Sequence, residues 1–150
     1  MKVILQKVKK ASVSVDGKIV GEIDKGYCLL VGVHKESTEA DAKYLAKKIV
    51  EARLFEDENE KLNLGLKDVN GSILSVSQFT LYADTKKGKR PSFTNAASAE
   101  EANELYNKFN VYLREEGIKV ETGIFQTMME VNIINDGPVT IIYEKLSLGN

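Results

Sequence analysis

The sequence predicts an α/β protein, a layered β/β/α single domain in which mostly antiparallel or mixed sheets carry two amphipathic helices on one side. Runs typical of strands occupy both ends of the chain, at residues 2–33 and 118–143, and another lies at 72–77. Only two segments, 38–50 and 98–117, repeat apolar residues at helical spacing. Because each of these has one apolar stripe, we expect both helices to cover the same side of the sheet layers.

The N-terminal region predicts a hairpin and then a buried strand. Ala11 to Val15 alternates between apolar and polar residues, and Asp16-Gly17 supplies the positive-φ pair that a two-residue hairpin turn prefers. Lys18 to Ile23 is the returning strand. Tyr27 to Val33 is almost continuously apolar, as a strand covered on both faces would be. Cys28 lies within that strand, and we expect it to be a core residue.

The two helices are marked by their N-terminal capping residues. Thr38 caps the first helix, with Asp41 three residues on, and Ser98 opens the second in a capping box with Glu101. The second helix is expected to end at Gly117. Each segment then has one face to bury, since its apolar residues recur at three- and four-residue intervals.

Shorter strands and turns complete the predicted order of elements. Leu54-Phe55 begins a short strand, and Ile118 to Glu121 forms another. Asn135 to Pro138 is predicted to be the last turn before a strand at Val139 to Tyr143. General X-Pro preferences alone predict a trans Gly137-Pro138 bond.

The predicted central strand, Ser72 to Ser77, ends in a cluster of polar groups. Ser77, Gln78 and Thr80 follow its apolar residues, while Phe79 anchors the segment. Hydroxyls, an amide and backbone N–H groups at a rigid strand end are what a site needs to hold a developing oxyanion without a metal. The same residues also fit a plain strand exit into a turn. Residue chemistry alone leaves both interpretations open.

The densest basic segment of the chain follows this cluster, in TKKGKRP at residues 85–91. Its cations surround Gly88 and either bind RNA phosphates or form a solvated loop. The four residues concerned are Lys86, Lys87, Lys89 and Arg90.

Composition excludes several classes of function. The formal net charge is −1, from 21 basic and 22 acidic residues, so any RNA contact must be local. One cysteine and one histidine, His34, predict no disulfide framework, no metal site and no cofactor. No signal peptide or membrane-spanning apolar run is evident, which favours a cytoplasmic protein without membrane contact. Without an evident Ser-His-Asp set or Cys-His pair, a hydrolase on this chain needs another source of nucleophile activation.

Two motifs carry a resemblance to a known family. SQFTL at Ser77 to Leu81, together with NDGPVT at Asn135 to Thr140, resembles the paired signature of the D-aminoacyl-tRNA deacylases, formerly D-tyrosyl-tRNA deacylases. The similarity extends from the opening QKVKKASVSVDG to the GPVT strand and so covers the whole chain. It implies an esterase that releases D-amino acids from tRNA as a proofreading step in translation. In such a reaction the neighbouring 2′-hydroxyl of the RNA is thought to assist.

The resemblance also implies roles for particular residues. Backbone amides around Ser77, Gln78 and Phe79 would hold the oxyanion, and Thr80 is the hydroxyl placed to act more directly. Gly137-Pro138, cis in the family, would enter the partner subunit's site, so the protein would be a homodimer with composite active sites. The carbonyl groups of Gly137-Pro138 would hold the substrate α-amine, and an L side chain would then point into the wall of the active site. Achiral glycine would pass, which implies some activity on glycyl-tRNA.

The remaining implied residues lie near the C-terminus, and two positions depart from the family. Phe125 and Met129 match positions that line the pocket for the terminal adenosine, although core packing is their default role. Lys7 stands where the family usually has arginine, and a lysine cannot make a planar bidentate contact with the Gly-Pro loop. Gln126-Thr127 stand where the family usually has Gly-Ala, which predicts a reshaped adenosine pocket.

Two other functions compete with catalysis. One is a non-catalytic RNA-binding module that uses the Lys86 to Arg90 loop. The other is a structural homodimer that the motifs merely stabilise. Hydrolysis of D-tyrosyl-tRNA, compared with L-tyrosyl-tRNA, distinguishes catalysis from both.

Overall fold

Strand β1 (Lys2–Val15) is the strand on which the sheet is built, in a computed structural model that describes residues 1–147. Along one edge it pairs with β2 (Lys18–Ile23) through its C-terminal half and with β3 (Gly26–Gly32) through its N-terminal half. Along the other edge it pairs with β8 (Glu130–Glu144) over nearly its whole length. All three pairings are antiparallel. The predicted hairpin is confirmed, with positive φ at both turn residues.

The sheet continues beyond β3 in parallel register and curves back toward β2. β6 (Ser72–Ser77) pairs with β3, and β7 (Val120–Thr122) pairs with β6, so the order is β2-β1-β3-β6-β7. A Cβ atom on Gly21 of β2 would lie 2.8 Å from the Thr122 carbonyl oxygen of β7. Only glycine fits this approach, where the six strands nearly close into a barrel.

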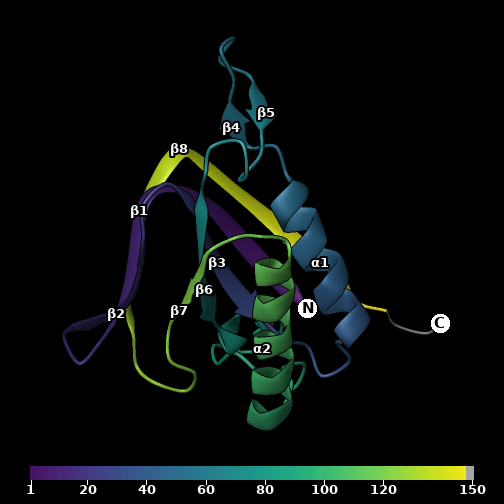
Figure 1. Cartoon of the computed structure of the whole chain (residues 1–150). Coiled ribbons are helices and arrows are strands. Elements are labelled where there is room, and N and C mark those ends of the chain that lie inside the picture. Colours follow the sequence, from purple (N-terminus) through teal and green to yellow (C-terminus); the bar gives the residue numbers. More distant parts are fainter. Residues whose placement is uncertain (148–150) are drawn as a thin grey trace.

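A short hairpin of β4 (Phe55–Glu56) and β5 (Leu62–Leu64) stands at one end of the molecule (Figure 1). Helices α1 (Glu39–Glu51) and α2 (Ala99–Glu115) pack together against one side of the sheet (Figure 1). The predicted α/β class, a mixed sheet with two helices on one side, is therefore confirmed. Neither helix of residues 1–147 has the length and apolar character needed to cross a membrane.

The helix caps follow the sequence closely. Thr38 and Asp41 form a reciprocal capping box: Thr38 Oγ1 accepts from the Asp41 N–H at 3.2 Å, and Asp41 Oδ2 accepts from the Thr38 N–H at 3.0 Å. At α2, Ser98 Oγ accepts from the Glu101 N–H at 3.3 Å, but the described residues show no return bond from Glu101. The predicted box at Ser98 is thus only half formed. Gly117 follows α2 with φ +89°, the left-handed conformation that ends helices.

Strand β8 corrects the predicted C-terminal turn, because it runs through the Gly-Pro motif without reversing. Asn135 pairs with Val8 and Thr140 with Gln6, so residues 136–139 oppose a single residue of β1 and bulge from the ladder. The reason is a tertiary contact: both halves of β8 pair with the same strand, β1. Residues 136–139 have no matching partners in β1 and therefore bulge out of the sheet.

The bulge is held by one side chain. Asn135 Oδ1 accepts from the Val139 N–H at 3.2 Å, and Asn135 Nδ2 donates to Thr140 Oγ1 at 3.3 Å. The Gly137-Pro138 bond is cis, as the family resemblance implies and against the general X-Pro preference. The result is a fixed, exposed Gly-Pro loop on an otherwise regular strand.

Apolar side chains gather in two clusters. The larger joins β1 and β3 to both helices, with Leu29 and Phe109 among its fully buried members. The smaller lies within the curved sheet and contains Val13, Leu74 and Cys28. Cys28 is fully buried, as predicted, and burial raises the pKa of its thiol to about 12. That thiol is therefore a packing group and not a nucleophile at neutral pH.

Candidate active site

The polar cluster at the end of β6 forms a 3-10 turn, η1 (Phe79–Tyr82). The Gln78 N–H donates to the Val31 carbonyl of β3 at 2.8 Å, which fixes the exit of the strand. The first N–H groups of a turn lie ahead of any acceptor within it. The hydrogen bonds of residues 1–147 include none donated by the N–H groups of Phe79 and Thr80. Two adjacent backbone donors thus remain available at an exposed position on a rigid strand end.

The Thr80 side chain is exposed, and its hydroxyl oxygen is already engaged. Gln78 Nε2 donates to Thr80 Oγ1 at 3.1 Å. Among the described residues, no imidazole, amine or carboxylate accepts a hydrogen bond from this hydroxyl. A threonine without a base is a weak nucleophile at neutral pH. Ser77, the half-buried last residue of β6, pairs with Val31 and supplies the rigid support.

His34, at the end of β3, is used locally. Its Nδ1 accepts from the Glu36 N–H at 2.9 Å, and its ring meets the Tyr82 ring edge-on, with centroids 5.0 Å apart. Burial is the main cause that lowers the pKa of His34, which favours the neutral imidazole. These contacts fit a structural role in the connection after β3.

Phe79 connects the turn to the basic segment. Its side chain is 57% exposed and meets the Phe93 ring at 5.0 Å between centroids, with planes 64° apart. Asp84 and Ser92 exchange two backbone hydrogen bonds, of 2.7 and 2.8 Å, which close the base of the loop at residues 85–91. The structure therefore brings together the two segments singled out from the sequence. All four of that loop's cations, Lys86, Lys87, Lys89 and Arg90, are exposed.

Sequence reasoning missed Phe93, because one aromatic residue in a loop does not indicate which ring it contacts. It also missed Tyr106 of α2, whose helical spacing indicates only a core position. The Tyr106 hydroxyl donates to the Ser75 carbonyl of β6 at 2.7 Å. The Tyr106 ring also lies against Phe125, with centroids 6.4 Å apart. Phe125 is thereby held close to β6.

Met129 lies on the same connection between β7 and β8. A Cβ atom on Gly123 would lie 2.6 Å from the Met129 sulfur, so a larger residue at position 123 would displace the Met129 side chain. Gln126 takes φ +60°, a conformation that glycine adopts freely, which gives a physical reason for glycine at this position in the family pattern. The Thr127 hydroxyl donates to the Ile124 carbonyl at 2.8 Å and completes the turn.

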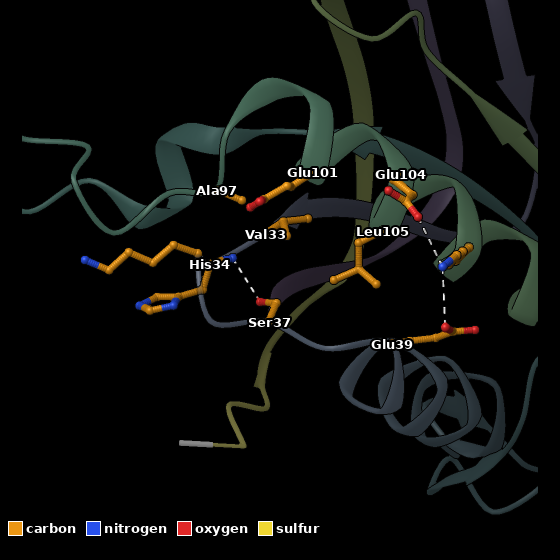
Figure 2. Close-up of a pocket in the computed structure, with 10 residues that line it drawn as sticks. Val33, His34, Ser37, Glu39, Ala97, Glu101, Glu104 and Leu105 are labelled. Carbon is orange, nitrogen blue, oxygen red and sulfur yellow. Dashed lines mark hydrogen bonds and ion pairs between the residues drawn. The ribbon is translucent and has the colours of Figure 1, made fainter. Parts of the chain in front are cut away.

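A cavity of about 300 Å³ lies between the end of β3 and the N-terminal parts of both helices (Figure 2). Lys108 spans it, 3.4 Å from Glu39 and 3.3 Å from Glu104, and the His34 N–H donates to Ser37 Oγ at 3.0 Å. None of the site residues predicted from the sequence lines this cavity. Its paired charges stabilise the contact between the helices, and the cavity is separate from the candidate site.

Comparisons with known proteins agree with the two motifs. The family model described as D-Tyr-tRNA(Tyr) deacylase matches residues 4–144. The chain belongs to this deacylase family. A D-aminoacyl-tRNA deacylase from Staphylococcus haemolyticus is 62% identical over 144 residues, 96% of this chain and 95% of the relative. One from Exiguobacterium sibiricum is 58% identical over 145 residues, 97% of this chain and 100% of the relative.

Two solved structures share the fold. One, described as c-Myc DNA Unwinding Element Binding Protein, superposes with a TM-score of 0.90 at 39% identity and covers 97% of this chain and 99% of that protein. The other, described as a probable eukaryotic D-amino acid tRNA deacylase, has a TM-score of 0.82 at 16% identity and covers 95% and 97%. At that identity the second likeness shows the fold alone.

Within one deacylase chain, the Gly137-Pro138 loop and the η1 turn lie far apart. Ser77 is level with Val3 of β1, whereas the loop lies opposite Lys7, about 13 Å further along the strand. Three strand spacings, about 14 Å in all, separate β8 from β6 across the sheet. One chain by itself therefore does not bring the two motifs of the deacylase signature to one site.

Lys7 does not clamp the loop among the described residues. Its side chain is 4% exposed, and its Nζ lies 5.3 Å from the centroid of the Phe55 ring. Lys7, which stands where the family usually has arginine, therefore makes a cation-π contact with Phe55 of β4.

Proposed function

We propose that this chain hydrolyses the ester bond of D-aminoacyl-tRNA and releases free tRNA and the D-amino acid. Membership in the deacylase family supports a hydrolase, and relatives about 60% identical over nearly the whole chain have that name. The observation that carries the proposal is the η1 turn, where the free N–H groups of Phe79 and Thr80 adjoin an exposed hydroxyl. The reaction would take place in the cytoplasm, where tRNA is charged.

The two free amides are proposed to bind the ester oxygen as it becomes an oxyanion. The resemblance also implies a role for the Gln78 amide, but that amide already donates to the Val31 carbonyl, so the proposal rests on the amides of Phe79 and Thr80. Donors fixed before the reaction stabilise developing charge without reorganisation, and one such donor contributes about 3 to 4 kcal/mol in other enzymes. The rigid end of β6 keeps both donors in place.

The nucleophile is proposed to be water, assisted by the substrate's own 2′-hydroxyl. Water adds to the ester carbonyl, the bond to the ribose 3′-oxygen breaks, and that oxygen leaves as a hydroxyl after gaining a proton. The 2′-hydroxyl adjoins both the carbonyl and the leaving oxygen, so it can relay the proton. Support comes from Thr80, whose hydroxyl has no neighbouring base among the described residues.

The complete site is proposed to form in a homodimer. Among residues 1–147, β8 pairs only with β1, so its outer edge carries backbone groups that these residues leave unpaired. Ile134 and Ile142 on this strand are 56% and 68% exposed. A long uncovered edge with exposed apolar residues is typical of an interface. A second copy docked there would supply the exposed Gly137-Pro138 loop that one chain keeps away from η1.

That loop is proposed to select chirality. Backbone carbonyl groups of Gly137 and Pro138 would accept hydrogen bonds from the substrate ammonium and fix its orientation. An L side chain would then point into the wall, whereas a D side chain would point into open space. Glycine has no side chain to exclude, so we propose activity on glycyl-tRNA as well.

The RNA is proposed to extend from the pocket to the basic loop. The exposed Lys86, Lys87, Lys89 and Arg90 would contact phosphates, because their loop is closed at Asp84 and Ser92 beside η1. Phe125 and Met129 would line the pocket for the terminal adenosine, with Phe125 held by Tyr106.

A nucleic-acid-binding protein without catalysis is the second candidate. The observation that favours it is the likeness, at 39% identity, to a structure described as a DNA unwinding element binding protein. This candidate would use the same basic loop, and it predicts RNA or DNA binding with no turnover of any ester.

The deciding experiment measures release of the amino acid from D-tyrosyl-tRNA, L-tyrosyl-tRNA and glycyl-tRNA. We expect rapid hydrolysis of the D ester, slower hydrolysis of the glycyl ester and no acceleration for the L ester. Binding of all three without hydrolysis would favour the second candidate.

A further inference from the structure

A second cavity, of about 260 Å³, opens directly beside the η1 turn. It lies between the start of β1, the C-terminal end of η1 and the first residues of the basic loop. Eight residues line it: Lys2, Leu81, Tyr82, Ala83, Asp84, Thr85, Lys86 and Asn95. This cavity shares no lining residue with the one between the helices.

The position of Lys2 relates this cavity to the candidate site. Lys2 Nζ donates to the Leu81 carbonyl at 3.4 Å and lies 5.0 Å from the centroid of the Tyr82 ring. Leu81 directly follows Thr80 in the chain. The Lys2 ammonium is therefore bound to the residue next to the proposed oxyanion donors. The Tyr82 hydroxyl donates to Glu144 Oε2 at 2.8 Å, which holds the ring in place.

The chemistry of the lining matches a ribose-phosphate linkage. Lys2 and Lys86 supply two ammonium groups from separate elements, which suits a phosphate monoanion. Asp84, Thr85 and Asn95 supply acceptors, which suit ribose hydroxyls. The Asp84 carboxylate also accepts from the Lys86 N–H at 2.9 Å, and this bond fixes the start of the basic loop.

We propose that this cavity binds the ribose-phosphate linkage immediately before the terminal nucleoside of the RNA. The inference rests on the proposed function and deepens it, because it gives the single-stranded end a path from the basic loop to Thr80. It assigns Lys2 as a substrate-binding residue, which neither signature motif includes. A phosphate contact so close to the reacting ester would locate the terminal nucleoside before chemistry.

The test compares two small substrates that differ by that one phosphate. The first is the D-tyrosyl ester of adenosine, which has no phosphate, and the second is the D-tyrosyl ester of cytidylyl-3′,5′-adenosine, which has one. The main variant is Lys2→Met, which keeps the aliphatic stem and removes the ammonium. Lys2→Arg restores the charge, and Lys61→Met on the distant β4–β5 hairpin is the matched control (Figure 1).

We expect Lys2→Met to lower kcat/KM for the dinucleotide ester about tenfold, mainly through KM, and to leave the nucleoside ester unchanged. Lys2→Arg should recover most of the loss, and Lys61→Met should change neither substrate. An equal loss on both esters would overturn the inference, because Lys2 would then act only through the η1 fold. No loss on either ester would overturn it as well.

A binding measurement separates this inference from the proposed function. Unesterified cytidylyl-adenosine and adenosine are titrated against the wild type and Lys2→Met, with amide NMR shifts as the readout. We expect the dinucleotide to bind the wild type more tightly than adenosine does, and Lys2→Met to abolish that difference. If no ester is hydrolysed but this difference is seen, the deacylase proposal fails and the cavity assignment stands. Equal affinity of both ligands for the wild type would overturn the assignment.

Discussion

Gln78 and Thr80 form a side-chain hydrogen bond across the start of η1, from Nε2 to Oγ1 at 3.1 Å. Thr80 accepts in this bond, so its own hydrogen remains free to donate to a bound substrate. The geometry suits a hydroxyl that positions the ester and not one that attacks it, since attack needs a base that takes the proton.

Thr80→Ala is expected to lower kcat/KM for D-tyrosyl-tRNA by less than about tenfold, because only one positioning hydrogen bond is removed. Thr94→Ala, at another exposed threonine, is the control. The companion substrate ends in 2′-deoxyadenosine, with the amino acid on the 3′-oxygen, and should react at least about 10²-fold more slowly if the 2′-hydroxyl relays the proton. Complete loss of activity in Thr80→Ala, with a trapped acyl-enzyme in the wild type, would make Thr80 the nucleophile.

The backbone donor of Phe79 can be removed by substitution with proline, which has no N–H group. Gln78 has φ −146° and ψ 93°, which lies outside the α region that a following proline disfavours, and proline is tolerated at the first position of a helical turn. Phe79→Pro should therefore lower kcat about 10²-fold more than Phe79→Ala, which removes the ring but keeps the N–H. Equal rates for the two variants would exclude this amide from the oxyanion site.

Composite sites predict complementation between two inactive variants. Gly137→Val should disable the loop for two reasons. Gly137 has φ +123°, which valine rarely adopts, and a Cβ atom at this position would lie 2.9 Å from Val139 Cγ2. Phe79→Pro should disable the turn. A mixed dimer then has one intact site, so refolding the two variants together should restore about a quarter of wild-type activity in a two-fold symmetric dimer. Sedimentation of a fully active monomer would contradict the proposal.

The basic loop predicts a salt effect. Replacing Lys86, Lys87, Lys89 and Arg90 with alanine should raise KM for tRNA and leave kcat nearly unchanged. The slope of log KM against log salt should fall by about 0.7 to 0.9 for each phosphate that the altered loop no longer neutralises. Replacing four exposed lysines elsewhere controls for net charge. An unchanged slope would show that the loop is only solvated.

Asp41 predicts a pH-dependent stability. Burial alone would raise the pKa of its carboxyl, but hydrogen bonds from the Ser147 hydroxyl, at 2.6 Å, and from the Thr38 N–H outweigh burial and hold the pKa below 3.8. The native state therefore binds fewer protons than the unfolded state, so this stabilisation is present above about pH 4 and is lost as the pH falls. Asp41→Asn should cost about 2 kcal/mol at pH 7 in urea unfolding. The cost should shrink steadily below about pH 4, and a constant cost would contradict the assignment.

Local signals in the sequence determined much of the fold. Asp16-Gly17 specified the first hairpin, since both residues need positive φ, and Thr38 with Asp41 specified the start of α1. The polar end of β6 was also evident, because hydroxyl and amide side chains interrupt an apolar run at Ser77. The Gly-Pro loop was recognised as a motif, but its neighbours along the chain suggested a turn. These signals act within a few residues, which is why one sequence suffices to read them.

Contacts between distant segments decided the rest. β8 keeps its direction through Gly137-Pro138 because β1 pairs with both of its halves. The residues of β8 alone do not indicate that β1 is the partner strand. The Gln78 N–H donates to the Val31 carbonyl of β3, whereas the N–H groups of Phe79 and Thr80 have no acceptor among the described residues. Lys2 reaches the carbonyl of Leu81, 79 positions away, only because β1 begins beside the end of η1. The sequence by itself determined which residues are chemically suited to a site, whereas tertiary pairing decided which of their hydrogen-bonding groups remain unused for substrate.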